Sequence, residues 1–127
     1  FKHLIIIGMG GAILNPMAIT GFCEPKDNAI KITYLYTIEP DKILELIKEI
    51  NFNETAFLII SQSGETIETL ALFTTWLQKY KENNIPNFNL HFYFIVGKGS
   101  NTLRKAAEEL DCIIFDHDEY ISGRYAT

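Results

Sequence analysis

Hydrophobic residues along the chain fall into short β-branched runs separated by stretches with helical spacing. Five runs predict strands, at Leu4–Ile7, Ile30–Ile38, Ala56–Ile60, Leu90–Val96 and Cys112–Phe115. The runs around Ile5 and Leu58 are apolar on both faces. This pattern is typical of strands that are covered by helices above and below, as in a parallel sheet.

The stretches between these runs place their apolar residues on one helical face. Three helices are predicted on this basis, at Asp41–Ile50, Glu65–Lys81 and Asn101–Leu110. A fourth is predicted at Ala12–Phe22, with Pro16 in its first turn. Strands that alternate with helices through short connections predict an α/β fold. We expect a five-stranded, doubly wound parallel sheet in a three-layer sandwich, with right-handed crossovers.

Composition narrows the class of protein. A chain of 127 residues suits a single core, and 47% hydrophobic with 21% charged residues excludes a disordered segment. No apolar run approaches the roughly 18 residues that a membrane helix requires. The net charge of −5 argues against a general nucleic-acid or membrane-surface binder. Cys23 and Cys112 form no metal or redox spacing, so a reduced, cytoplasmic setting is expected.

The two ends of the sequence suggest a piece of a longer protein. The chain opens with Phe1 in place of Met and enters a strand-like run within three residues. It closes on Ser122–Thr127, which does not resemble a natural polar tail. We therefore expect the chemistry to be divided between this piece and another.

Residues that follow the strands carry the functional information, because open parallel sheets bind ligands at the carboxyl ends of their strands. After the first strand comes Gly8-Met9-Gly10-Gly11-Ala12, where small residues would let the backbone approach a ligand. A dinucleotide fingerprint would need a further glycine where Ile13 stands, and there is no Walker A lysine. The alternative, that these glycines only form a tight strand-to-helix turn, stays open.

The strongest feature follows the third strand and reads Ser61-Gln62-Ser63-Gly64-Glu65-Thr66. It places three hydroxyls and a glycine where a helix is predicted to begin, near Glu65. Unpaired N–H groups and the positive end of the helix dipole attract anions there, and phosphate suits a cluster of short donors. The alternative is that Ser63 only caps the helix. One cap accounts for one hydroxyl, so the anion site is favoured.

Two carboxylates stand against this interpretation. Glu65 and Glu68 fall in the first predicted helical turn, where they stabilise the dipole but would repel a dianion that they faced. Either they point away from the anion, or one of them serves in proton transfer or hydroxyl binding. The sequence does not choose between these alternatives.

Polar residues also follow the fourth and fifth strands. Ser100 or Asn101 is expected to cap the next helix, and Lys98 either adds positive charge to the pocket or is solvated. The run Asp116-His117-Asp118-Glu119 is not expected to bind a metal, because consecutive residues rarely converge on one ion. Arg124 could stabilise a developing oxyanion at the edge of the sheet, or it could be an ordinary surface arginine.

The six residues Ser61–Thr66 resemble the phosphate loop of SIS (sugar isomerase) domains. Three further elements narrow the resemblance: the opening Ile6-Ile7-Gly8-Met9-Gly10-Gly11, Thr69 in the following helix, and the closing Gly123-Arg124-Tyr125. Together they resemble the first of the two SIS domains in the phosphoglucose isomerase (glucose-6-phosphate isomerase) family. The resemblance covers essentially the whole chain and implies a flavodoxin-like SIS sugar-phosphate-binding domain at residues 1–127.

The resemblance implies an aldose–ketose isomerase in the full-length protein. The reaction is the cofactor-free, reversible conversion of glucose 6-phosphate to fructose 6-phosphate in glycolysis and gluconeogenesis. A carboxylate base carries a proton between C2 and C1 through a cis-enediolate. The implied partners are the sugar phosphate and a second copy of the protein in a homodimer, with no nucleic acid, membrane or metal.

The resemblance also assigns roles to individual residues. Ser61, Gln62, Ser63 and Thr66 would bind the substrate phosphate. Gly10, Gly11, Ala12 and Gly123 would line the sugar-facing loop, and Arg124 would stabilise the charge of the enediolate.

Several positions depart from the family pattern. Ala12 replaces a serine and Gln62 replaces a lysine of the phosphate loop, while Ser122 and Ala126 replace a glycine and a serine beside the arginine. The family's catalytic Glu, ring-opening His and late Lys all lie downstream of this segment. On its own, the piece is therefore expected to bind sugar phosphate weakly and to catalyse nothing.

Two other functions share the phosphate-loop motif. One is the isomerase half of a glucosamine-6-phosphate synthase, against which Gly123-Arg124-Tyr125 argues. The other is a non-catalytic sensor of sugar phosphates, which would suit the lost Ser and Lys contacts. A second SIS domain downstream would favour the isomerase.

Overall fold

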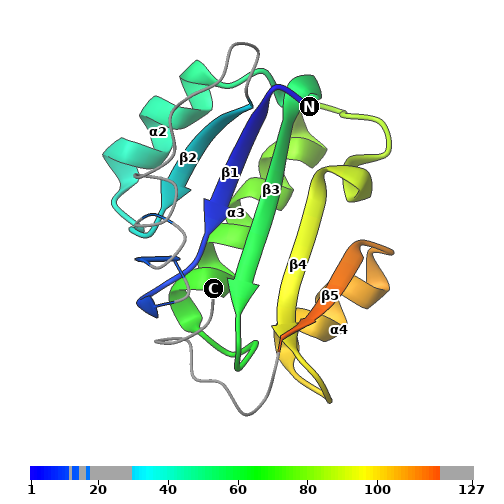
Figure 1. Cartoon of the computed structure of the whole chain (residues 1–127). Coiled ribbons are helices and arrows are strands. Elements are labelled where there is room, and N and C mark those ends of the chain that lie inside the picture. Colours follow the sequence, from blue (N-terminus) through cyan, green and yellow to red (C-terminus); the bar gives the residue numbers. More distant parts are fainter. Residues whose placement is uncertain (12, 15–16, 18–29, 118–127) are drawn as a thin grey trace.

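In the computed structural model, residues 1–11, 13–14, 17 and 30–117 are described. Five strands form one sheet in the order β2-β1-β3-β4-β5, and every neighbouring pair is parallel (Figure 1). The strands are β1 (His3–Ile7), β2 (Lys31–Leu35), β3 (Thr55–Ser61), β4 (Phe92–Gly97) and β5 (Ile113–His117). The predicted five-stranded parallel α/β fold is confirmed.

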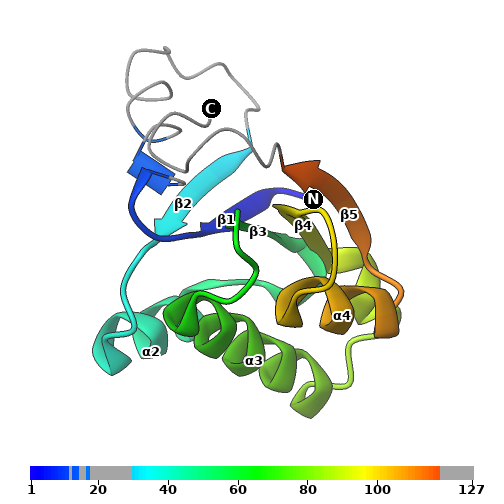
Figure 2. The same cartoon turned by 90° about the horizontal axis from the view of Figure 1, so that it is seen from below.

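Three helices cover one face of this sheet, as Figure 2 shows. They are α2 (Pro40–Glu49), α3 (Ile67–Glu82) and α4 (Thr102–Glu109). Short 3₁₀ turns, η1 (Phe52–Glu54) and η2 (Phe88–His91), precede β3 and β4. The predicted fourth strand therefore begins later than its apolar run suggests, because residues before Phe92 are used in the turn.

The main core lies between the sheet and these helices. Aromatic side chains fill this core, and the ring of Phe57 stacks on that of Phe92. Phe57 also contacts Trp76 and Tyr80 of α3, and Phe92 contacts Tyr80. The Tyr80 hydroxyl donates to the Thr55 carbonyl at 2.9 Å, which fixes the end of α3 against the start of β3. The predicted helical stripe on α3 thus gives the helix a defined position on the sheet.

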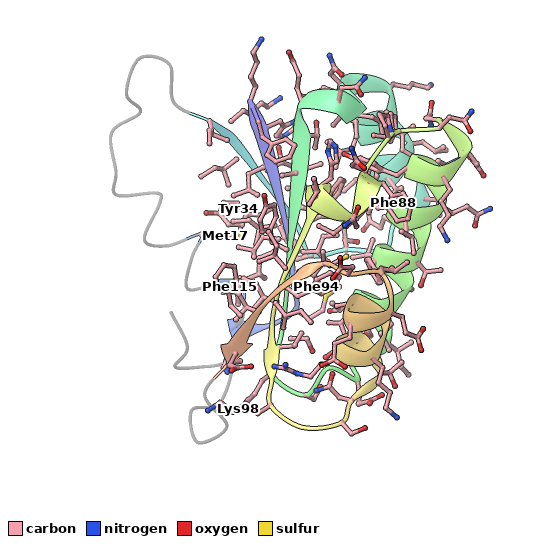
Figure 3. The ribbon with its side chains drawn as sticks, turned by 90° about the vertical axis from the view of Figure 1, so that its right-hand side faces the viewer. Met17, Tyr34, Phe88, Phe94, Lys98 and Phe115 are labelled. Atoms are coloured by element: carbon pink, nitrogen blue, oxygen red, sulfur yellow. The ribbon has the colours of Figure 1, made fainter. Side chains whose placement is uncertain are left out.

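A second, smaller core lies on the opposite face. Ile6 and Ile60 are buried there with Ile13, and Met17 and Tyr34 pack beside them. Figure 3 shows Met17, Tyr34 and Phe115 on one side of the sheet and Phe94 on the other. Residues 11, 13, 14 and 17 are helical, as a doubly wound sheet requires. The rest of the helix predicted over 12–22 lies outside the described residues.

The strand order fixes where a ligand crevice can form. In a sheet ordered 2-1-3-4-5 the direction of winding reverses between β1 and β3, and ligands bind outside the carboxyl ends of these two strands. Ile7 lies opposite Ile59 in the register of this pair. The segments that follow β1 and β3 therefore leave the same edge of the sheet side by side (Figure 1).

Among the described residues, no helix is long and apolar enough to cross a membrane.

Candidate functional site

The segment after β1 turns sharply at Gly10. This residue has a φ of +58°, which a side chain disfavours, and its carbonyl accepts from the N–H groups of Ile13 (3.2 Å) and Leu14 (3.0 Å). Gly10 therefore forms a tight strand-to-helix turn, and this turn is compatible with both interpretations of the glycine segment. Gly10 is exposed and Gly11 is half-buried at the switch point, beside the segment that follows β3.

Residues 61–66, the Ser61 loop, connect β3 to α3. The Ser61 side chain is buried, and its Oγ accepts the Gly64 N–H at 3.0 Å. The same oxygen lies 3.3 Å from Oγ1 of Thr66. Two of the three hydroxyls singled out in the sequence therefore meet inside one turn of chain.

The third hydroxyl, that of Ser63, is placed differently. Ser63 is exposed and its Oγ accepts the Glu65 N–H at 3.1 Å, inside the loop. Helix α3 begins at Ile67 with Thr66 as its N-cap residue, and the Thr66 side chain makes no capping hydrogen bond. The expectation of a helix from Glu65 is wrong by two residues, and Ser63 is not its cap. The reason is that hydrogen bonds within the loop hold Gly64 and Glu65 out of the helix.

The corner between β4 and α4 supports the Ser61 loop. The Gly97 N–H donates to the Gln62 carbonyl (3.1 Å), and the Leu103 N–H donates to the Gly64 carbonyl (3.0 Å). Gly97 also has no room for a side chain, because a Cβ would lie 2.2 Å from the Gln62 carbonyl oxygen. These long-range contacts fix the backbone of the loop from one side.

Asn101 caps α4, which selects one of the two expected capping residues. Its Oδ1 accepts the Arg104 N–H at 2.9 Å, and its amide donates to the Gly97 carbonyl at 3.1 Å. The buried Asn101 side chain also lies directly against Gly64. One residue therefore starts α4 and packs on the loop.

The structure shows where Glu65 points. One carboxylate oxygen accepts the Thr102 N–H and the other accepts the Thr102 hydroxyl, each at 2.7 Å. The hydroxyl bond, and then the backbone bond, lower the pKa of this carboxyl. Glu65 thus faces the N-terminus of α4. Glu68 is exposed in the first turn of α3.

Sequence reasoning missed Arg104, whose guanidinium joins the ends of two strands. Nε donates to the Gly97 carbonyl at 2.9 Å, and Nη2 pairs with Asp116 Oδ1 at 2.5 Å. A polar residue on a helix gives no signal of such contacts, since they depend on tertiary structure. Asp116 is engaged by this arginine, and the described residues contain no cluster of His, Cys, Asp and Glu that could hold a metal.

Lys98 directly follows Gly97, the residue whose N–H donates to the Gln62 carbonyl of the Ser61 loop. Lys98 is exposed beyond the end of β4 (Figure 3). Ala12, Gly123 and Arg124 lie outside the described residues, as do Asp118 and Glu119.

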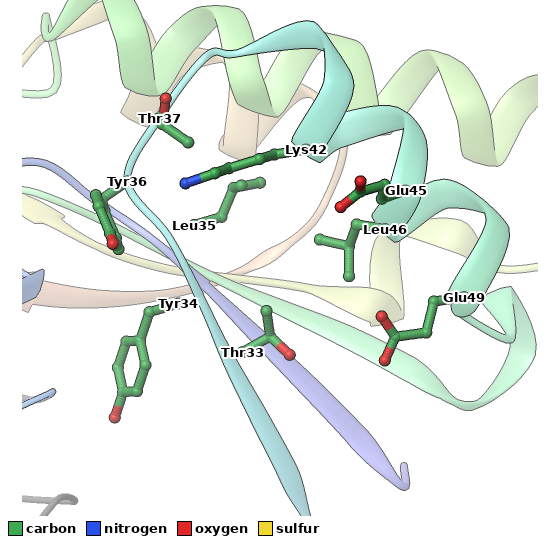
Figure 4. Close-up of a pocket in the computed structure, with 9 residues that line it drawn as sticks. All are labelled: Thr33, Tyr34, Leu35, Tyr36, Thr37, Lys42, Glu45, Leu46 and Glu49. Carbon is green, nitrogen blue, oxygen red and sulfur yellow. The ribbon is translucent and has the colours of Figure 1, made fainter.

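A separate pocket lies between β2 and α2 (Figure 4). Lys42, Glu45 and Glu49 line it together with residues 33–37 and Leu46. None of its lining residues belongs to the segments that follow β1 and β3, so this pocket is not the predicted site.

Comparisons with known proteins agree on one family. The chain is 32% identical over 126 residues to the glucose-6-phosphate isomerase of Methanocaldococcus jannaschii, covering 99% of this chain and 30% of that protein. It is 35% identical to the glucose-6-phosphate isomerase of Borrelia garinii subsp. bavariensis, covering 99% of this chain and 24% of that protein. The chain thus spans less than a third of these relatives.

Two solved structures superpose on nearly the whole of this chain. A hypothetical protein from Thermus thermophilus superposes with a TM-score of 0.89 at 26% identity, over 98% of this chain and 30% of that one. A glucose-6-phosphate isomerase from Chlamydia trachomatis superposes with a TM-score of 0.81 at 30% identity, over 98% of this chain and 23% of that one. The family model for phosphoglucose isomerase matches residues 1–127, so the chain belongs to the phosphoglucose isomerase family.

Proposed function

We propose that this chain is the phosphate-binding domain of a glucose-6-phosphate isomerase. The whole protein would interconvert glucose 6-phosphate and fructose 6-phosphate, and would work as a cytoplasmic homodimer. The chain itself would bind the phosphate end of the sugar through the Ser61 loop. The carboxylate base and the ring-opening residues would come from the remainder of the protein.

One observation carries this proposal. The hydroxyls of Ser61 and Thr66 lie 3.3 Å apart beside the first turn of α3, at the switch point of the sheet. The N-terminus of a helix presents N–H groups that have no acceptor within the helix, together with the positive end of its dipole. An anion with several acceptor oxygens, such as a phosphate ester, matches this set of donors.

The charge of the loop also fits this role. Gln62 stands where the family commonly has lysine, so the loop would bind phosphate through neutral donors rather than through a cation. Glu65, the one carboxylate inside the loop, is turned toward Thr102. Within the loop, a dianion would therefore face hydroxyls and N–H groups, while Glu68 is exposed in the first turn of α3.

The remaining assignments extend the proposal along the sugar. Gly10 and Gly11, on the neighbouring segment, would lie beside the sugar together with Ala12 and Gly123. Arg124 would stabilise the negative charge of the enediolate, because a guanidinium is a fixed cation with several donors. The proton transfer itself would use a base outside this chain.

A coupled assay on the whole protein that carries this chain tests the function. Glucose 6-phosphate is supplied and fructose 6-phosphate is measured, and the reverse reaction is followed in the same way. We expect turnover in both directions, and we expect the isolated chain to give none. A whole protein that binds glucose 6-phosphate without converting it would contradict the isomerase assignment and favour a sensor.

A further inference from the structure

Glu65 presents a physical problem for any phosphate-binding role of the Ser61 loop. It is exposed, it lies next to Thr66, and a free carboxylate at that position would repel a dianion. Such repulsion would weaken binding unless the charge is held elsewhere.

The structure provides a partner for this charge. Both oxygens of Glu65 are engaged by Thr102, the first residue of α4 and 37 positions away in sequence. The carboxylate therefore lies at the positive end of the α4 dipole, and Lys105 on the same helix adds a further attraction. Its negative charge is compensated by α4, away from the start of α3.

The same contact completes a set of fixed points for the loop. Gln62 and Gly64 are held through their carbonyls, by Gly97 and Leu103. Glu65 is held through its side chain by α4, and it directly precedes Thr66. Its position therefore influences where the Thr66 hydroxyl and the first N–H groups of α3 lie.

We propose that Glu65 is a positioning residue for phosphate binding, which acts through Thr102 to hold the Ser61 loop in its binding geometry. The inference rests on the proposed function of the loop. It adds that the affinity for the phosphate group depends on the start of α4, which lies outside the Ser61 loop. Because of its contact with Thr102, the Glu65 carboxylate, which would otherwise repel the phosphate, instead stabilises the loop that binds it.

Two pairs of variants separate geometry from charge. Glu65→Ala removes both hydrogen bonds, whereas Glu65→Gln retains them: its carbonyl accepts the Thr102 N–H and its amide donates to the Thr102 hydroxyl. Thr102→Val removes only the hydroxyl, and Thr102→Ser restores it. Glu109→Gln, an exposed carboxylate near the other end of α4, is the matched control for loss of one charge.

The measurement is the KM and kcat of the whole protein for glucose 6-phosphate, together with thermal unfolding of each variant. For Glu65→Ala we expect KM to rise about tenfold, with a smaller change in kcat, because the loss of both hydrogen bonds to Thr102 loosens the loop. For Thr102→Val we expect a smaller rise in KM in the same direction. Glu65→Gln, Thr102→Ser and Glu109→Gln should keep the wild-type KM within about twofold.

The outcomes distinguish this inference from the proposed function. An active wild type whose KM is unchanged in folded Glu65→Ala and Thr102→Val would overturn the positioning role and leave the function standing. A rise in KM for Glu65→Gln equal to that for Glu65→Ala would also overturn it, since geometry would then be irrelevant. A wild type that neither binds nor converts glucose 6-phosphate would overturn both.

Discussion

Gly64 lies so close to the side chain of Asn101 that a Cβ on residue 64 would fall 1.9 Å from Oδ1 and 2.2 Å from Cγ. Asn101 cannot move aside cheaply, because its amide and carbonyl are both hydrogen-bonded at the start of α4. Gly64 also has a φ of +67°, in the left-handed region. The glycine is thus required twice, for conformation and for space.

Replacing Gly64 with alanine should therefore destabilise the protein strongly. We expect Gly64→Ala to lower the free energy of unfolding by about 3 kcal/mol, as left-handed strain and overpacking add. Gly10→Ala is the matched control: its φ is +58°, but a Cβ there meets no described atom within 4 Å. It should cost about 1 kcal/mol. Urea unfolding measures both, and equal losses would contradict the role of Asn101.

A negative charge on Ser63 should oppose phosphate binding. We expect Ser63→Asp to weaken the affinity for glucose 6-phosphate at least about tenfold, because like charges repel at the start of α3. Ser63→Asn is nearly isosteric with that variant, is uncharged and can still accept the Glu65 N–H, so it should lose clearly less affinity than Ser63→Asp. Isothermal calorimetry on the whole protein compares the two. Similar affinities for Asp and Asn would argue against a phosphate at this loop.

The buried hydroxyl of Thr69, in the first turn of α3, has no hydrogen-bond partner among the described residues and is only 1% exposed. An unsatisfied buried hydroxyl is costly, and valine has nearly the same shape. We expect Thr69→Val to raise the free energy of unfolding by about 1 kcal/mol.

Thr74→Val is the control on the same helix. Thr74 is exposed and its hydroxyl donates to the Leu70 carbonyl at 2.8 Å. Removing this hydroxyl should leave the free energy of unfolding unchanged or lower it slightly. Thermal unfolding of the two variants gives the comparison. A destabilised Thr69→Val protein would mean that this hydroxyl has a partner in solution.

His3 is expected to make the stability of the fold sensitive to mild acid. Its Nε2 lies 2.7 Å from Thr33 Oγ1, and burial, followed by the charge of Lys31, lowers its pKa below 6.5, while Glu49 partly offsets this. The unfolded chain therefore takes up a proton at higher pH than the folded chain does. The stabilisation is fully present above the unfolded pKa and is lost as the pH falls through the folded pKa.

We expect the urea concentration at the unfolding midpoint to decrease as the pH is lowered from about 7.5 to about 5. The decrease should be smaller in His3→Gln, whose side-chain amide can still reach Thr33. The difference between the two proteins in this pH dependence isolates His3 from other titrating groups. An identical dependence in both would contradict the lowered pKa.

Much of the fold could be predicted from local pattern. Runs such as Leu4–Ile7 alternate with stretches such as Asp41–Ile50, and the observed strand β1 and helix α2 lie within about a residue of these. Periodicity identifies buried faces well, because apolar residues recur along a strand or helix with the period of that element. The predicted elements and the rule that parallel strands end at the same edge of a sheet also place the segments after β1 and β3 at one edge.

The pattern failed where contacts between distant residues decide the local structure. Helix α3 starts at Ile67, two residues later than predicted, because the hydroxyls of Ser61 and Ser63 accept hydrogen bonds from N–H groups within the loop. The partner of Glu65 could not be inferred, since Thr102 belongs to another helix. Arg104 gave no signal, because its bond to Gly97 requires α4 to pack against the end of β4, and its bond to Asp116 requires β5 to pair with β4. Local sequence thus predicts the elements, and the packing of loops fixes the site.

An amide NMR titration of the isotope-labelled chain with glucose 6-phosphate tests the phosphate site most directly, with glucose as the control ligand. If the Ser61 loop binds the phosphate group, glucose 6-phosphate should shift the amides of residues 61–66 and of Gly10 and Gly11 first, and glucose should leave residues 61–66 unchanged. Shifts confined to the surroundings of Lys98, or equal shifts with both ligands, would contradict it.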